Sequence, residues 1–182
     1  DGSYEYYMRE KVITNDAKGI GSFILAANEM ELAALPKPAK GKILTLDSYF
    51  NNEVKNGVSW HYKWDETAMS GFSILGETFK RNGFSLATLK EAPTAANLQN
   101  HSVYVIVDPD NLKDSPTPNY MDDKSVSAVA AWVKAGGALV LFANDSANAD
   151  LKHFNKLANA FGIHFNNQMI NHVTNDVTRE GG

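Results

Sequence analysis

The stretch "SVYVIVDPD" (residues 102–110) decides the fold. It is a nearly continuous apolar run, and it ends in two aspartates separated by a proline. Such runs are typical of strands that are buried on both faces of a parallel sheet. We therefore predict that this segment is a central strand of an α/β protein.

Other β-prone runs lie on both sides of this strand in the sequence. They are "KILTLDSYF" (42–50), "FSLATL" (84–89), "ALVLFAND" (138–145) and "IHF" (163–165), of which the last is predicted to begin a fifth strand.

Segments with helical periodicity separate most of these runs. Phe72, Leu75 and Phe79 share one face of a helix that ends at residues 82–83. Asp122 opens another helix, and a third begins near Ala147. This alternation predicts an open, mostly parallel sheet with crossover helices on both faces.

The first part of the chain has a different character. Residues 17–35 place Phe23 and Met30 on one face of an amphipathic helix, and Pro36 and Pro38 prevent the helix from continuing. We predict three segments: a helical end of a preceding α/α-barrel domain (1–35), a linker (36–41) and an α/β domain (42–182), whose C-terminal end we expect to be truncated.

Composition excludes several classes of function. The 182 residues carry a net charge of −4 without a basic cluster, so nucleic acid is not an expected partner. There is no cysteine, which excludes thiolate metal sites and cysteine nucleophiles. No apolar run is long enough to span a bilayer. The chain does not begin with Met, and we expect it to be a segment of a longer protein.

Ligands of open α/β sheets bind beyond the carboxyl ends of the strands. In this sequence those positions hold Asp47, Ser48 and Tyr49, then an aromatic loop, then Asp108 and finally a polar turn. The candidate binding residues are Trp60, His61, Trp64, Asp65, Asp108, Asn144 and Asp145.

Three interpretations of these residues stay open. His61 with Asp108 or Asp145 would suit a divalent metal. Trp60 or Trp64 would suit stacking on a sugar, with carboxylates accepting its hydroxyl groups. Alternatively, the Asp and Asn side chains only cap turns and helices.

We assign no catalytic residue, metal or cofactor. A triad of Ser146, His61 and Asp108 lacks the G-x-S-x-G elbow around its serine. No phosphate-binding glycine loop follows a strand. The other histidines, including His101, are scattered without ligand spacing and are predicted to be surface or structural residues.

Two parts of the chain resemble known families. "GSYEYY" and "NDAKGIGSFILAANEMEL", within residues 2–32, resemble the end of the α/α-barrel of unsaturated rhamnogalacturonyl hydrolases, glycoside hydrolase families 105 and 88. The segment from 42 to about 172, with "HYKWDETAMSGFSILG" and "WVKAGGALVL", is similar to the C-terminal domain of some bacterial members. That domain is similar to the flavodoxoid fold of class I glutamine amidotransferases.

The resemblance implies a pectin-degrading parent enzyme whose catalytic acidic residues lie upstream of this segment. The amidotransferase nucleophile is a cysteine, and the matching region here reads "FANDSAN". The expected role is therefore that of an accessory, non-catalytic domain that packs against the barrel, aids oligomer assembly or contacts oligosaccharide. The resemblance favours a periplasmic or secreted parent. The alternative is an autonomous hydrolase that uses His61, Asp65, Asp108 and Asp145.

Overall fold

The computed structural model describes residues 4–9, 17–168, 172–174 and 177–179. The chain divides into two compact units, residues 1–37 and residues 38–182. The first unit contains helix α1 (Tyr4–Arg9) and helix α2 (Ala17–Ala34). Helix α2 agrees with the helix predicted over residues 17–35, and the division falls within the predicted linker. No described helix has the length and apolarity that crossing a bilayer requires.

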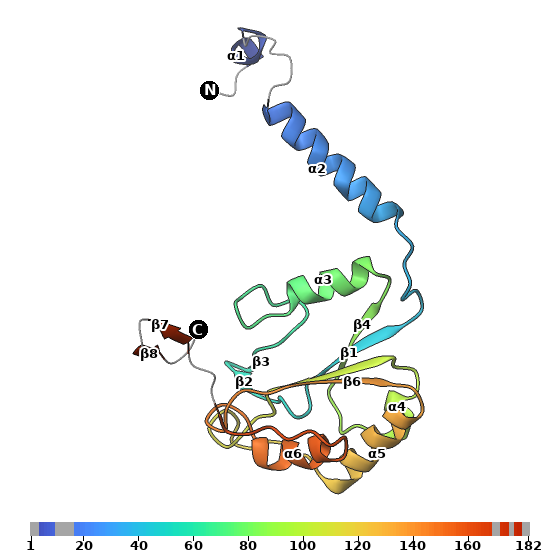
Figure 1. Ribbon diagram of the computed structural model, residues 1–182, viewed down its shortest axis with the longest axis vertical. Helices are drawn as coiled ribbons and strands as arrows, with labels where there is room; N and C mark the ends of the chain where they lie inside the picture. The colour runs from blue at the N-terminus through green and yellow to red at the C-terminus, as the bar shows by residue number, and fades with distance from the viewer. Residues whose placement is uncertain (1–3, 10–16, 169–171, 175–176, 180–182) are drawn as a thin grey trace. The chain divides into compact units, whose positions relative to one another are not determined.

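The second unit is built on a four-stranded sheet in the order β4-β1-β5-β6 (Figure 1). All three neighbouring pairs are parallel. In register, Thr45 of β1 lies opposite Tyr104 of β5, and Tyr104 lies opposite Leu139 of β6. The predicted α/β class with an open parallel sheet is therefore confirmed.

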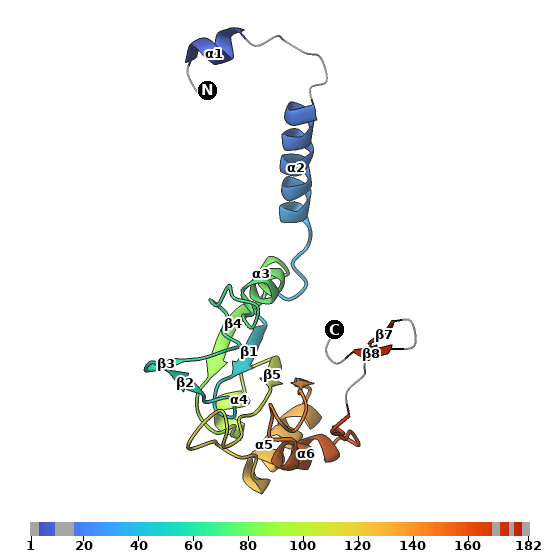
Figure 2. The same cartoon turned by 90° about the vertical axis from the view of Figure 1, so that its left-hand side faces the viewer.

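The elements of this unit follow the chain from β1 to β8. The strands are β1 (Ile43–Asp47), β2 (Val54–Lys55), β3 (Val58–Ser59), β4 (Ser85–Leu89), β5 (Val103–Val107), β6 (Ala138–Phe142), β7 (His172–Thr174) and β8 (Val177–Arg179). The helices are α3 (Ser73–Arg81), α4 (Ala95–Leu98), α5 (Asp123–Lys134) and α6 (Leu151–Asn159). Figure 2 labels the β2-β3 and β7-β8 hairpins, which are separate from the main sheet.

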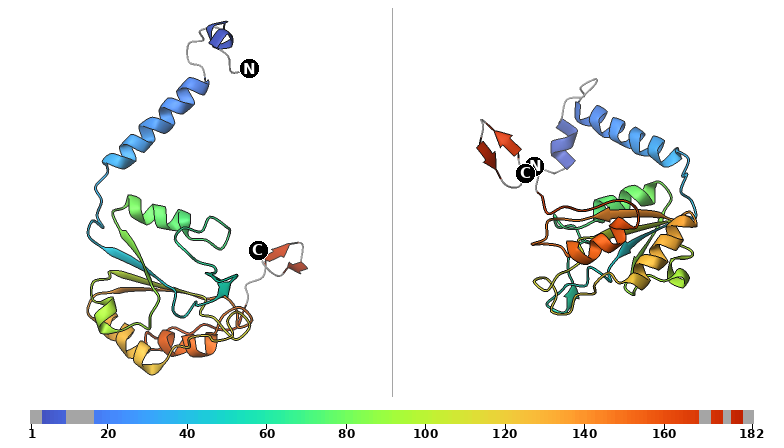
Figure 3. Two further views of the ribbon diagram at one scale, coloured as in Figure 1. Left: turned by 180° about the vertical axis from the view of Figure 1, so that it is seen from behind. Right: turned by 60° about the horizontal axis from the view of Figure 1, so that its bottom comes forward.

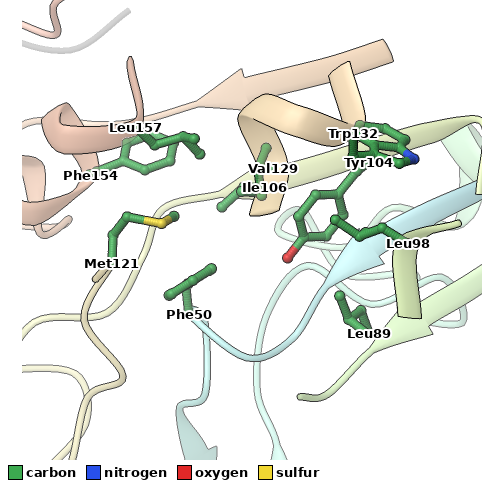
Figure 4. Packing of buried hydrophobic residues seen from close by; sticks show 10 residues of the cluster. All are labelled: Phe50, Leu89, Leu98, Tyr104, Ile106, Met121, Val129, Trp132, Phe154 and Leu157. Atoms are coloured by element: carbon green, nitrogen blue, oxygen red, sulfur yellow. The ribbon is translucent and has the colours of Figure 1, made fainter. Parts of the chain in front are cut away.

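Alternation along the strands divides the core into two layers. Leu44 and Leu46 of β1 pack with Val105 and Val107 of β5, and the aromatic side chains around α3 cover this face. Tyr104 points to the opposite face, where side chains from α4, α5 and α6 pack. Figure 4 shows this second cluster, and Figure 3 shows from behind that helices cover both faces. Helices therefore cover both faces, as predicted.

The predicted fifth strand is wrong. Residues 163–165 are irregular, because the side chain of Asn155 in α6 bonds both backbone groups of Phe165. Its Nδ2 donates to the Phe165 carbonyl at 3.0 Å, and its Oδ1 accepts from the Phe165 N–H at 2.8 Å. Phe165 thus obtains both of its backbone bonds from one side chain instead of from a neighbouring strand.

One boundary and two short elements differ from the sequence prediction. Helix α6 begins at Leu151 rather than near Ala147, because Asp145 holds the preceding turn by accepting from the Ala147 N–H at 2.8 Å. The sequence pattern also missed α4, a single turn with a reciprocal cap, and the β2-β3 hairpin. That hairpin turns at Asn56 and Gly57, both with positive φ, which is a common arrangement in tight hairpins.

Candidate functional site

The carboxyl ends of β1 and β4 border a cavity of about 330 Å³. The loop that follows β3 closes one side of it. The lining residues are Leu46, Asp47, Ser48, Asn51, Ser59, His61, Tyr62, Lys63, Trp64, Asp65, Thr88 and Lys90. We call this space the carboxyl-edge cavity. Its position is the one at which open α/β sheets bind ligands.

Asp47 is the buried carboxyl of this cavity, with 4% of its surface exposed. It accepts hydrogen bonds from the Tyr104 hydroxyl at 2.6 Å and from the N–H groups of Phe50 and Asn51 at 2.8 and 3.2 Å. Burial raises the pKa of Asp47 to about 6, although these donors favour its ionised form. Asp47 therefore joins β1, the following loop and β5, and it titrates close to neutral pH.

The loop above Asp47 has an unusual backbone. His61 and Tyr62 have φ angles of +62° and +46°, in the left-handed region that residues with side chains seldom adopt. Tyr62 donates its hydroxyl to Asp108 Oδ2 at 2.7 Å, and its N–H bonds the Ser70 carbonyl at 3.2 Å. Burial and the bond to Asp108 raise the pKa of the Tyr62 phenol above its usual range. Tyr62 is therefore a hydrogen-bond donor that fixes this loop to the end of β5.

His61 has few polar contacts. Its Nε2 lies 3.8 Å from Glu53 Oε2, and its Nδ1 is buried without a hydrogen-bond partner among the described residues. Its ring lies next to the rings of Trp60 and Tyr62. His61 thus brings a polar atom into the cavity wall that the protein itself does not satisfy.

The two tryptophans have different surroundings. Trp64 donates its Nε1–H to the Ala87 carbonyl at 2.8 Å and packs on Gly76, where an added Cβ would lie 3.1 Å from the ring. The Trp60 ring lies 4.8 Å from that of His61, and the Lys55 ammonium lies 4.4 Å from its centre. Trp64 is thus part of the cavity wall and the core, whereas Trp60 does not line the cavity.

The remaining predicted residues do not all gather at the cavity. Asp65 is exposed and lines it, but Asp108, Asn144 and Asp145 do not. Asp108 accepts from Tyr62 and from the Asn144 backbone, while Asp145 holds its own turn by accepting from Asn148 Nδ2 at 3.0 Å. Local capping therefore accounts for Asn144 and Asp145.

Asp110 was not among the predicted site residues, although it lies only two positions after the predicted residue Asp108. It is 2% exposed and accepts from the Asn52 N–H at 2.6 Å. Burial, with the nearby carboxylates Glu53 and Asp114, raises the pKa of Asp110 to about 7. This burial could not be predicted from the sequence pattern, because Asn52, which bonds Asp110, lies 58 positions away in the chain.

The positions of the described residues can be compared with the serine triad and the metal site considered from the sequence. Within the described ranges, no hydrogen bond joins Ser146, His61 and Asp108, and the Ser146 N–H bonds Asn167 Oδ1 at 3.0 Å. The described side chains include no group of three or more His, Asp or Glu residues arranged to hold a metal ion. What the carboxyl-edge cavity does offer is hydroxyl, amide, carboxylate and ammonium groups around one concave space.

Comparisons with known proteins gave no match: neither a family model, nor a curated protein, nor a solved structure is similar to the chain.

Proposed function

We propose that residues 42–182 form an accessory, non-catalytic domain that contacts an acidic oligosaccharide in a pectin-degrading glycoside hydrolase. The proposal joins the resemblance of the sequence to the C-terminal region of unsaturated rhamnogalacturonyl hydrolases with the chemistry of the carboxyl-edge cavity. It includes a flavodoxoid relationship for the domain and a catalytic barrel as its natural neighbour.

The observation that carries the proposal is the set of polar groups around the cavity. Lys63 and Lys90 supply two cations for a uronate carboxylate. Ser48, Ser59 and Asn51 add groups that hydrogen-bond sugar hydroxyls. A volume of about 330 Å³ lies at the lower end of the range for small-molecule pockets and suits one or two sugar rings.

A non-catalytic role agrees with the composition and with the bonding of the buried groups. The chain contains no cysteine to act as an amidotransferase nucleophile. Asp47 already accepts three hydrogen bonds from the protein and holds the β1 loop. Such a carboxyl is a structural anchor whose removal would disturb the cavity itself.

A hydrolase remains the second candidate because of His61. Its Nδ1 has no partner among the described residues, its backbone is left-handed, and it lines the same cavity as Asp65. Such features also occur at catalytic sites. In that case the full chain would hydrolyse sugar esters or glycosides, and a His61→Gln variant would lose the activity while keeping its fold.

The experiment is a titration of the ¹⁵N-labelled full chain with a galacturonate–rhamnose disaccharide. The indole N–H of Trp64 serves as the reporter, because this residue lines the cavity. We expect a saturable shift of that resonance at millimolar sugar, weakened at least about tenfold in a Lys63→Met/Lys90→Met variant. The neutral galactose–rhamnose disaccharide should bind more weakly.

Lys134→Met is the matched control, since this exposed lysine of α5 does not line the cavity. An unchanged Trp64 resonance at saturating concentrations of the acidic sugar would refute carbohydrate contact at this site. Equal binding of the acidic and neutral sugars would refute the role assigned to the two lysines.

A further inference from the structure

A second cavity, larger than the carboxyl-edge cavity, lies at the opposite edge of the sheet. It measures about 610 Å³ and is bordered by the amino ends of β1, β5 and β6, by α4 and by the last turns of α5. Its lining residues are Lys42, Phe84, Ala95, Gln99, His101, Ser102, Val103, Ala128, Ala131, Trp132, Ala135, Gly136, Gly137 and Ala138. We call it the amino-edge cavity, and the function proposed above makes no use of it.

We propose that the amino-edge cavity binds a compact aromatic carboxylate. Its walls are mostly methyl groups and rings, from alanines of α4 and α5 together with Phe84 and Trp132. The charged group in the lining is the ammonium of Lys42, and no carboxylate of the described residues lines the cavity. An apolar hollow with a few placed polar groups is the usual form of a small-molecule site.

His101 supplies a directed donor in this cavity. Its Nδ1 lies 2.6 Å from the hydroxyl of Thr45, which is completely buried. Among the described residues Thr45 Oγ1 has no other partner, so its proton has no other acceptor, and a buried hydroxyl needs one. Thr45 therefore donates to Nδ1, and the proton of the neutral ring resides on Nε2.

Partial burial favours the neutral form of the His101 imidazole. The pKa of His101 is lowered because its partial burial disfavours the charged form. A neutral ring with Nδ1 occupied by Thr45 presents Nε2–H as a hydrogen-bond donor. Together, Lys42 and His101 give a carboxylate one cation and one neutral donor.

Trp132 connects the apolar floor of the cavity to His101. Its Nε1–H donates to the His101 carbonyl at 3.3 Å, and its ring lies so close to Gly137 that a Cβ there would overlap it. The ring also meets that of Tyr104 edge-on, with ring centres 6.4 Å apart. Figure 4 labels both residues in the second cluster. Because Gly137 has no side chain, the Trp132 ring can pack against it in the cavity floor. A ligand that perturbs the floor will therefore change the environment of the Trp132 indole N–H.

The test is a titration of the ¹⁵N-labelled full chain with benzoate, with benzamide as the uncharged analogue. We expect benzoate to shift the Trp132 indole N–H saturably at millimolar concentration, while the Trp64 indole N–H stays in place. Benzamide should bind at least about tenfold more weakly. This readout separates the two cavities, so either proposal can fail while the other stands.

Variants make the assignment specific. Lys42→Met should weaken benzoate at least about tenfold, whereas Lys134→Met, which removes an exposed lysine outside the cavity, should leave affinity unchanged. Ala131→Phe, at an exposed lining position, should abolish binding by filling the hollow without disturbing the core. An unshifted Trp132 resonance, equal affinity for benzoate and benzamide, or binding that survives Ala131→Phe would each overturn the proposal.

Discussion

Two buried polar side chains of β1, Thr45 in its middle and Asp47 at its carboxyl end, have opposite effects on the strand. Thr45 and Asp47 point to the same face of the strand, both are buried, and each bonds a side chain 56 or 57 residues away. Toward the amino edge Thr45 bonds a neutral imidazole, and toward the carboxyl edge Asp47 bonds a phenol and two backbone N–H groups. A neutral pair costs little to bury, whereas a carboxyl makes its end of the strand sensitive to protons.

Removal of the Asp47 side chain should give the largest effect. Asp47→Ala leaves the Tyr104 hydroxyl and the N–H groups of Phe50 and Asn51 without their acceptor in a buried space. We expect a loss of roughly 3 to 4 kcal/mol in the free energy of unfolding. Urea denaturation at pH 7 measures it. A loss smaller than that of the Thr45 variant described below would contradict this account of the strand.

The pH dependence of stability should be the next largest effect. The pKa of Asp47 rises from 3.8 in the unfolded chain to about 6 in the fold, so the folded state holds more protons between these values. Stability should therefore be highest below about pH 4 for this group and should fall by roughly 2 to 3 kcal/mol as pH rises through 6.

Denaturation at several pH values measures this loss, and Asp47→Asn provides the comparison. The variant should lose the part of the fall that Asp47 causes between about pH 4 and 6. It should keep the part that Asp110 causes, which runs from about pH 4 to 7 because burial raises the pKa of that carboxyl from 3.8 to about 7. If the wild-type protein instead gained stability between pH 4 and 6 relative to Asp47→Asn, the predicted direction of the pH dependence would be wrong.

Loss of the Tyr62 hydroxyl tests how firmly the carboxyl-edge loop is attached. Tyr62→Phe removes the bond to Asp108 Oδ2 but keeps the ring that packs near Phe72. We expect a loss of about 1 to 2 kcal/mol in stability, because this bond has a charged acceptor. Proteolysis of the 60–72 loop should become faster in proportion. An unchanged cleavage rate would mean that the backbone bonds alone hold the loop.

The smallest effect is expected at the amino edge. Thr45→Val replaces a hydroxyl by a methyl group of similar size and removes one neutral hydrogen bond. The free energy of unfolding should therefore fall by about 1 kcal/mol. The His101 ring should then lose its tautomer preference, which the ¹⁵N shifts of the imidazole report. A retained Nε2–H tautomer in this variant would show that Thr45 does not set it.

The sequence pattern predicted the strands of the sheet because each is a short apolar run bounded by turn residues. It predicted α5 and α3 because their apolar faces repeat with helical period. It was wrong about residues 163–165, where a run of similar appearance is bonded by Asn155. The composition of residues 163–165 does not indicate that Asn155 bonds this segment.

Some of the residues that the sequence nominated as a binding site line the carboxyl-edge cavity, and others do not. His61, Trp64 and Asp65, from the loop that follows the first strand, line it, and their binding of a ligand stays a prediction. Asp47 was seen to follow a strand, but its bond to Tyr104 spans 57 residues, and single-sequence patterns do not report contacts of that range. The same limit hid the pairing of His101 with Thr45.

Asn155 has a consequence for anyone who wishes to redesign this protein. Its side-chain amide bonds both the N–H and the C=O of Phe165, as a neighbouring β-strand would. Strand β6 is the last strand of the described sheet on that side. A designer who wanted to widen the sheet would begin by replacing Asn155, which would release the backbone of Phe165 for pairing with a strand. A designer who wanted to keep the sheet at its present width would leave this residue alone.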